Sequence, residues 1–174
     1  MAPPPSTVVS PVVTLIVRVL TFTCLLISVI IIATNKATSI IDINLATNTA
    51  TSVEMKFSDF YAYRYMLASG VIGMAYTVLQ IAFTIFYVSS GNRFGGDGLT
   101  LLEFYGDKVL SYLLATGAAA CFGLTVDLNR LPENDSEAQG FLNKANAAAS
   151  LLFIGFIFSA ISSVFSSLSL PKRG

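Results

Sequence analysis

Two charged residues lie within segments that are otherwise apolar. Arg18 is the single charged residue in residues 11–35, and Asp107 stands directly before Lys108 and the charge-free residues 109–126. Each apolar stretch has about the length that crosses the hydrocarbon core of a bilayer. An ionised side chain at that depth is costly unless it has a partner, so both residues are candidates for a functional or structural site.

The positions of the two charges along their helices predict that they meet. Ser10 is suited to cap the first helix, and Thr100 with Glu103 three residues later is a capping-box pattern for a later helix. Arg18 and Asp107 follow these caps by eight and seven residues, which places both roughly 10–12 Å along their helices. In a four-span chain the first and third helices run in the same direction. We therefore expect an intramembrane ion pair between Arg18 and Asp107.

Composition places the elements that carry these charges in a membrane. Of the 174 residues, 54% are hydrophobic and 11% are charged, which is far too apolar for a soluble domain. The net charge is zero, so no nucleic-acid partner is expected. We predict an all-α membrane protein, a four-transmembrane-helix bundle, with a disordered tail at 1–10, a membrane domain at 11–170 and a short tail at 171–174. The predicted spans are about 11–34, 59–88, 100–127 and 140–170.

The residue types that are absent exclude much catalytic chemistry. The chain has no histidine, which removes Ser-His and Cys-His catalysis and the commonest metal ligand. Cys24 and Cys121 fall inside predicted spans, where thiols pack as small apolar groups. Glu103 and Asp107 are one helical turn apart and could share acid–base chemistry, but their place at a helix N-terminus already accounts for them. We expect no enzyme, no catalytic residue, no cofactor and no metal site.

The polar segment between the first two spans contains two strand-like pieces. Isoleucines and a leucine gather in residues 40–45, and apolar and charged residues alternate in residues 53–57. Alternation with a period of two is typical of a half-buried strand. A short β-hairpin in the first extracellular loop and an irregular loop both fit this pattern.

Small residues recur at helical spacing in the third and fourth spans. Helices in lipid associate through close backbone contact and polar side chains, and small residues permit both. The stripes therefore indicate either packing within the bundle or an interface with another protomer, and the serines could also line a pore. The residues concerned are Ala115, Ala119 and Gly123 in the third span, and Gly155, Ser159 and Ser163 in the fourth.

The loop before the fourth span contains a glycosylation sequon, Asn134-Asp-Ser136. Glycosylation at Asn134 would require this loop to face the outside, which would leave both termini inside. The basic residues divide almost evenly between the two sides and do not decide the orientation.

Several of these residues resemble those of the plant CASP-like proteins, relatives of the Casparian strip membrane domain proteins that are similar to MARVEL domains. The resemblance covers about residues 18–172. Its markers are Arg18, the segment 56–65 that enters the second span, and the segment 104–112 that opens the third. Arg18 and Asp107 match the charged pair that is the hallmark of the family.

The resemblance implies a multi-pass protein of the plasma membrane with both termini cytosolic. It implies a homo-oligomer in contact with membrane lipids, and related CASP-like proteins and secreted cell-wall enzymes as partners. The family founders form membrane platforms that guide local cell-wall modification, but their characteristic stretch is missing from the first outer loop here. A non-enzymatic scaffold is the first functional hypothesis. A small channel or transporter that uses the Arg18–Asp107 pair is the alternative.

Overall fold

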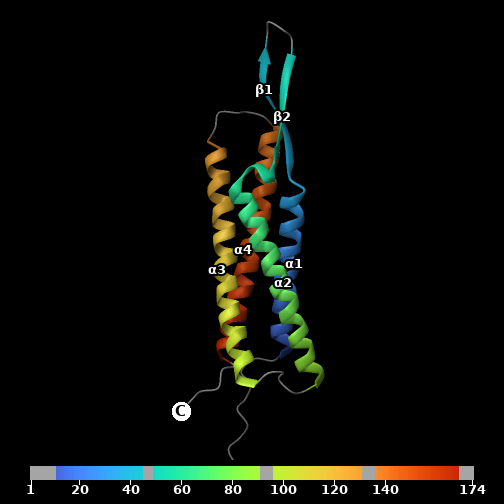
Figure 1. The fold of residues 1–174 in the computed structure, drawn as a ribbon, viewed down its shortest axis with the longest axis vertical. Coiled ribbons are helices and arrows are strands. Elements are labelled where there is room, and N and C mark those ends of the chain that lie inside the picture. Colours follow the sequence, from blue (N-terminus) through green and yellow to red (C-terminus); the bar gives the residue numbers. More distant parts are fainter. Residues whose placement is uncertain (1–10, 45–48, 91–95, 131–135, 169–174) are drawn as a thin grey trace, which may run out of the picture.

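The computed structural model describes residues 11–44, 49–90, 96–130 and 136–168, which form four long helices and a pair of strands (Figure 1). The predicted four-helix bundle of an all-α membrane protein is confirmed. The two strands stand beyond one end of the bundle, here called the strand end. The elements are α1 (Pro11–Ala33), β1 (Lys36–Asn44), β2 (Thr49–Lys56), the short 3₁₀ helix η1 (Phe57–Asp59), α2 (Tyr61–Ser90), α3 (Gly96–Leu128) and α4 (Ser136–Leu168).

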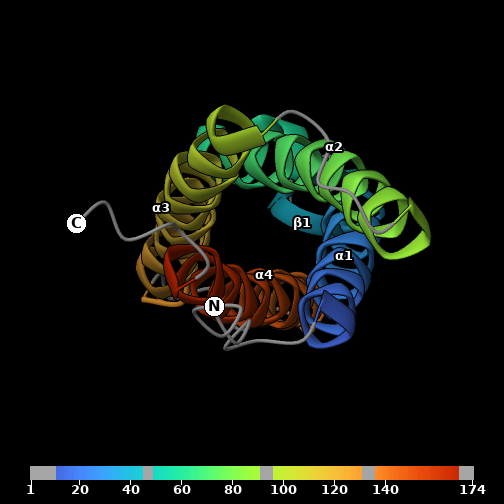
Figure 2. The same cartoon turned by 90° about the horizontal axis from the view of Figure 1, so that it is seen from below.

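The four helices form a closed ring in the order α1, α2, α3, α4 (Figure 2). Each helix packs against its two neighbours in that ring, so α1 and α3 lie diagonally across the bundle. Side chains from α1 and α3 can therefore approach each other only at the centre, where α2 and α4 also contribute.

All four helices are long and apolar enough to cross a membrane. The two longest, α3 and α4, have 33 residues each, or roughly 50 Å at the rise of an α-helix. A bilayer core is about 30 Å thick, so these helices extend beyond it. The candidate spans are Val12–Ala33, Tyr61–Phe86, Glu103–Leu128 and Ser136–Ser167.

The polar segment between α1 and α2 forms the antiparallel strands β1 and β2. The pairing runs from Lys36 opposite Lys56 to Asn44 opposite Thr49, with an irregularity between Ile40 and Asp42. This is a longer pairing than the two strand-like pieces of the sequence indicate.

Side-chain hydrogen bonds fix where the chain leaves the helices at the strand end. Asn35 follows the last turn of α1, and its Nδ2 donates to the backbone oxygen of Phe141 on α4 at 2.9 Å. Between β2 and α2, the carboxylate of Asp59 accepts a hydrogen bond from the backbone nitrogen of Lys56 at 2.8 Å. The first contact ties the end of α1 to α4, and the second shapes the turn from β2 into η1.

The core differs between the two ends of the bundle. Towards the strand end it is aromatic, with the rings of Tyr63 and Phe141 edge to face at 5.7 Å. Leucines fill the middle, where Leu25, Leu114 and Leu152 are completely buried. The opposite end contains the buried polar groups that are described below.

Glycines on α3 test how closely the helices pack. A methyl group added at Gly117 would collide with the side chain of Ser69 and lie 3.2 Å from Leu152, whereas one at Gly123 would meet no atom within 4 Å.

We expect Gly117→Ala to lower the free energy of unfolding by about 1–3 kcal/mol through overpacking. Gly123→Ala is the matched control, and it should leave stability unchanged or raise it by up to about 1 kcal/mol through helix propensity. Thermal unfolding in mild detergent measures both, and equal losses would contradict the close contact at Gly117.

Candidate functional site: a buried polar cluster

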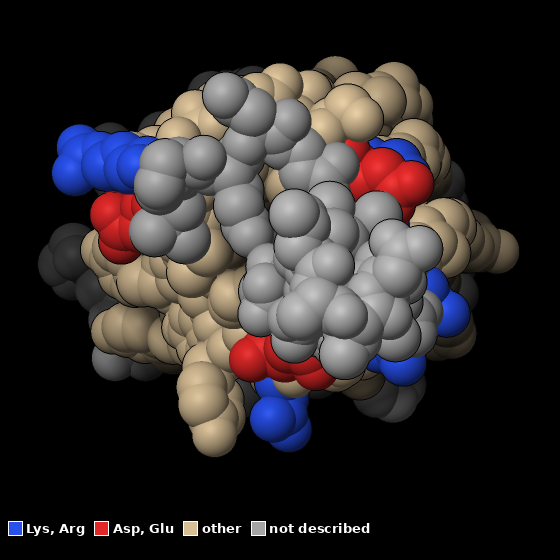
Figure 3. Space-filling view, turned by 90° about the horizontal axis from the view of Figure 1, so that it is seen from above, with Lys and Arg blue, Asp and Glu red and all other residues tan. Residues whose placement is uncertain are grey.

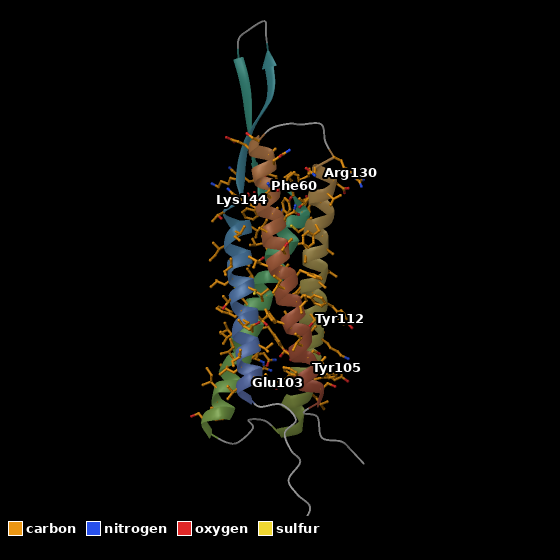
Figure 4. All side chains as sticks on the ribbon, turned by 180° about the vertical axis from the view of Figure 1, so that it is seen from behind. Phe60, Glu103, Tyr105, Tyr112, Arg130 and Lys144 are labelled. Carbon is orange, nitrogen blue, oxygen red and sulfur yellow. The ribbon has the colours of Figure 1, made fainter. Side chains whose placement is uncertain are left out.

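Polar side chains from all four helices meet inside the bundle near the end opposite the strands. Figure 4 shows Glu103 at this end, and Phe60, Arg130 and Lys144 at the strand end. Two of the polar side chains that meet here, Arg18 and Asp107, are only 5% and 3% exposed. We call this group the polar cluster; it consists of Arg18, Tyr76, Gln80, Thr84, Glu103, Asp107, Ser111, Ser159, Ser162 and Ser166.

The carboxylate of Asp107 accepts hydrogen bonds from both helices that flank α3. Its Oδ1 accepts from the hydroxyl of Tyr76 at 3.1 Å and from Nε2 of Gln80 at 3.4 Å, both on α2. Its Oδ2 accepts from the hydroxyls of Ser162 at 3.4 Å and Ser166 at 3.0 Å, both on α4. Hydrogen bonds to a charged acceptor are stronger than neutral ones. These donors replace the water that a carboxylate loses inside an apolar bundle.

The guanidinium of Arg18 is held by α2 and α3. Its Nη1 donates to the backbone oxygen of Gln80 at 3.0 Å and to the hydroxyl of Thr84. Its Nη2 lies 4.0 Å from Oε2 of Glu103, whose side chain is 25% exposed. The ion-pair partner of Arg18 in the structure is therefore Glu103, and the direct pair with Asp107 predicted from the sequence is not formed.

Arg18 and Asp107 do not pair directly because the two charges are offset from each other along α2. Asp107 is bound by Tyr76 and Gln80, whereas Arg18 is bound at Gln80 and Thr84, one turn further along. One turn is about 5.4 Å, and Glu103 precedes Asp107 on α3 by the same amount. Counting residues from helix caps placed the two charges at one depth and missed this offset.

Gln80 and Tyr76 join the two charges, and sequence reasoning missed both. The Nε2 of Gln80 donates to the Tyr76 hydroxyl as well as to Asp107, while its backbone oxygen accepts from Arg18. A methyl group added at Gly106 would overlap the hydroxyl of Tyr76, so this glycine gives the ring its place beside α3. The signal was present: Tyr76, Gln80 and Thr84 follow one another at four-residue steps on one helix face.

The two stripes of small residues occupy different environments. On α4, Gly155, Ser159 and Ser163 are buried inside the bundle. A methyl group at Gly155 would lie 3.0 Å from Leu25, and the hydroxyl of Ser159 lies 3.1 Å from that of Ser111.

On α3, Ala115 is half-buried, whereas Ala119 and Gly123 are exposed on the outside of the bundle. The candidate glycosylation residue, Asn134, lies outside the described residues.

Comparison with known proteins identifies the family. The Casparian strip membrane protein domain matches residues 8–158. This chain belongs to that family. It is 51% identical to CASP-like protein 4D1 of Ricinus communis over 99% of both chains. It is 50% identical to CASP-like protein 4D1 of Glycine max, over 98% of this chain and 94% of that one. It is 43% identical to CASP-like protein 4D2 of Arabidopsis thaliana over 99% of both. No solved structure matches the chain.

Family membership and the four apolar helices together define a multi-pass membrane protein of the plant CASP-like type. The resemblance predicted from the sequence is confirmed. Arg18 and Asp107, which carried that resemblance, both belong to the polar cluster.

The polar cluster predicts an energetic coupling between Arg18 and Asp107 through the groups that join them. Arg18→Leu and Asp107→Leu should each lower the free energy of unfolding by about 3–5 kcal/mol. The first removes the cation beside the carboxylates of Glu103 and Asp107, and the second leaves the buried donors around Asp107 without their acceptor. The double variant should lose less than the sum, by about 0.5–3 kcal/mol.

Thermal melts and delivery to the cell surface measure these effects. Lys108→Leu is the control, since Lys108 adjoins Asp107 on α3 but is exposed and should change stability by less than about 1 kcal/mol. Strictly additive losses in the double variant would mean that the two charges are independent.

Proposed function

We propose that this chain is a non-enzymatic scaffold of the plasma membrane, whose copies associate and organise a membrane domain that guides local cell-wall modification. Membership of the Casparian strip membrane protein domain family supports a role in a membrane domain. The chain has no histidine, and the carboxylate of Asp107 is enclosed by its hydrogen-bond partners, which supports a structural rather than a catalytic role.

The observation that carries self-association is the outward stripe on α3. Its residues follow each other at steps of three and four and are all exposed, so they lie along one side of the helix. Figure 4 shows Tyr105 and Tyr112 of this stripe pointing away from the bundle. We call it the α3 outer face; it comprises Tyr105, Val109, Tyr112, Thr116, Ala119 and Gly123.

The chemistry of the α3 outer face suits contact with another helix in lipid. Ala119 and Gly123 leave room for a second backbone to approach closely. Thr116 adds a polar group at the surface, held by a 2.9 Å hydrogen bond between its hydroxyl and that of Tyr65 on α2. The outward residues of α1 are by contrast large and aliphatic, as at Ile16 and Ile30, which suits contact with lipid chains.

The proposed topology has both termini in the cytosol and the strand end outside. α1 begins and α4 ends at the same end of the bundle, so the first and last described helix ends share one side (Figure 1). At the strand end, basic and acidic side chains lie next to one another (Figure 3). This mixture agrees with the nearly even division of basic residues between the two sides, which does not decide the orientation. In this orientation β1 and β2 face secreted cell-wall enzymes, while the α3 outer face meets related CASP-like proteins and lipids.

The test of self-association enlarges the small residues of the α3 outer face. Ala119→Leu combined with Gly123→Leu should weaken the oligomer about tenfold or more, the effect of losing about 1.4 kcal/mol of contact energy. Ala75→Leu is the matched control, because Ala75 is exposed on the outside of α2. Blue-native electrophoresis and cross-linking in mild detergent give the oligomer fraction, and fluorescence recovery in the plasma membrane gives the mobility. A wild-type chain that is monomeric and diffuses freely would refute the scaffold.

The alternative function is transport through the bundle, which the buried charges of the polar cluster favour. A path would also have to pass the completely buried leucines Leu25, Leu114 and Leu152 in the middle of the core. We therefore expect reconstituted liposomes to show no ion flux above that of empty vesicles. A flux that is present in the wild type and lost in Asp107→Asn would favour transport instead.

A further inference from the structure

Two buried polar atoms of the polar cluster have no hydrogen-bond partner among the described residues. They are Nε of Arg18 and Oε1 of Gln80. Their side chains are nine-tenths or more buried, and the hydrogen bonds and ion pair of the other polar atoms in these two side chains are those given above. Burying a polar group without a hydrogen-bond partner costs free energy. Two such groups in one cluster therefore indicate a small bound molecule that serves as partner to both.

Both residues line one small cavity between the four helices, within the polar cluster near the end opposite the strands. Its volume is about 10 Å³, and its wall includes Arg18, Tyr76, Thr77, Gln80, Asp107 and Leu110. A polar cavity of this size holds about one water molecule, and it is too small for an organic ligand.

The charges of the wall restrict the occupant further. The guanidinium of Arg18 repels a cation, and the carboxylate of Asp107 repels an anion. The two unpartnered atoms need opposite kinds of hydrogen-bond partner. Nε of Arg18 is a donor and needs an acceptor, whereas Oε1 of Gln80 is an acceptor and needs a donor. The occupant must therefore be a neutral molecule of water size that both accepts and donates.

We propose that the cavity binds one structural water molecule, which accepts from Nε–H of Arg18 and donates to Oε1 of Gln80. Its second O–H then donates a hydrogen bond to the cavity wall on the side of Asp107. The water and Gln80 together connect the two charges that make no direct contact. Each of them thereby belongs to a single hydrogen-bonded network that spans all four helices.

The first test detects the water through radiolytic hydroxyl labelling of the protein in lipid nanodiscs. A buried bound water yields radicals that label the side chains beside it. Leu110 lines the cavity, whereas Leu114 is one turn further along α3, is completely buried and does not line it. We expect Leu110 to be labelled several-fold more than Leu114. Equal labelling of the two leucines would overturn the proposal.

The second test fills the cavity from Thr77, which lines it and whose hydroxyl donates to the backbone oxygen of Gly73 in its own helix. Thr77→Val keeps the side-chain volume, and Thr77→Ile adds one carbon, so loss of the hydroxyl is common to both. With a bound water, Thr77→Ile should melt about 2–4 °C below Thr77→Val and should lose the labelling of Leu110. An isoleucine variant that melts above the valine variant would mean that the cavity is empty, since filling a dry cavity stabilises.

Discussion

The structure depends on keeping a carboxylate, Asp107, inside an apolar bundle. Lipid and leucine offer no polar partners, so each helix packed around Asp107 must supply them. α2 provides Tyr76 and Gln80, and α4 provides Ser162 and Ser166. Such contacts form at only one rotation and one register of each helix, whereas apolar contacts tolerate many. The carboxylate of Asp107 therefore fixes how α2 and α4 sit against α3, while Arg18 holds α1 to α2 and to Glu103 on α3.

The sequence predicted the elements and the charged residues of this arrangement well, because charges are rare inside apolar segments and stand out. Arg18 and Asp107 were found in this way, and both lie in the polar cluster. Their relative position was not predictable, since helix offset depends on packing between helices, as where Gly106 admits Tyr76. The ion-pair partner of Arg18 is Glu103, whose spacing from Thr100 equally fits a helix capping box, so the sequence alone does not distinguish the two roles.

The direction in which a small residue faces was likewise beyond the sequence. Gly155 and Gly123 stand in stripes of similar composition, yet Gly155 packs against Leu25 and Gly123 faces outward. In a soluble protein the polar side of a helix marks its outside. In a membrane both sides of a helix are apolar, so that mark is missing and the neighbouring helices decide.

The diagonal placement of α1 and α3 has a consequence for biosynthesis. The chain is made from its N-terminus, so Arg18 enters the bilayer before any of its partners exist. α2 brings Gln80 and Thr84, α3 brings Glu103 together with Asp107, and the hydroxyls of Ser162 and Ser166 arrive only with the last helix. Until α4 is inserted, one side of the carboxylate is open to lipid. The polar cluster is thus complete only when the whole membrane domain has been made. A chain that stops short of α4 exposes a charge inside the membrane, and this exposed charge distinguishes the incomplete protein from the finished one.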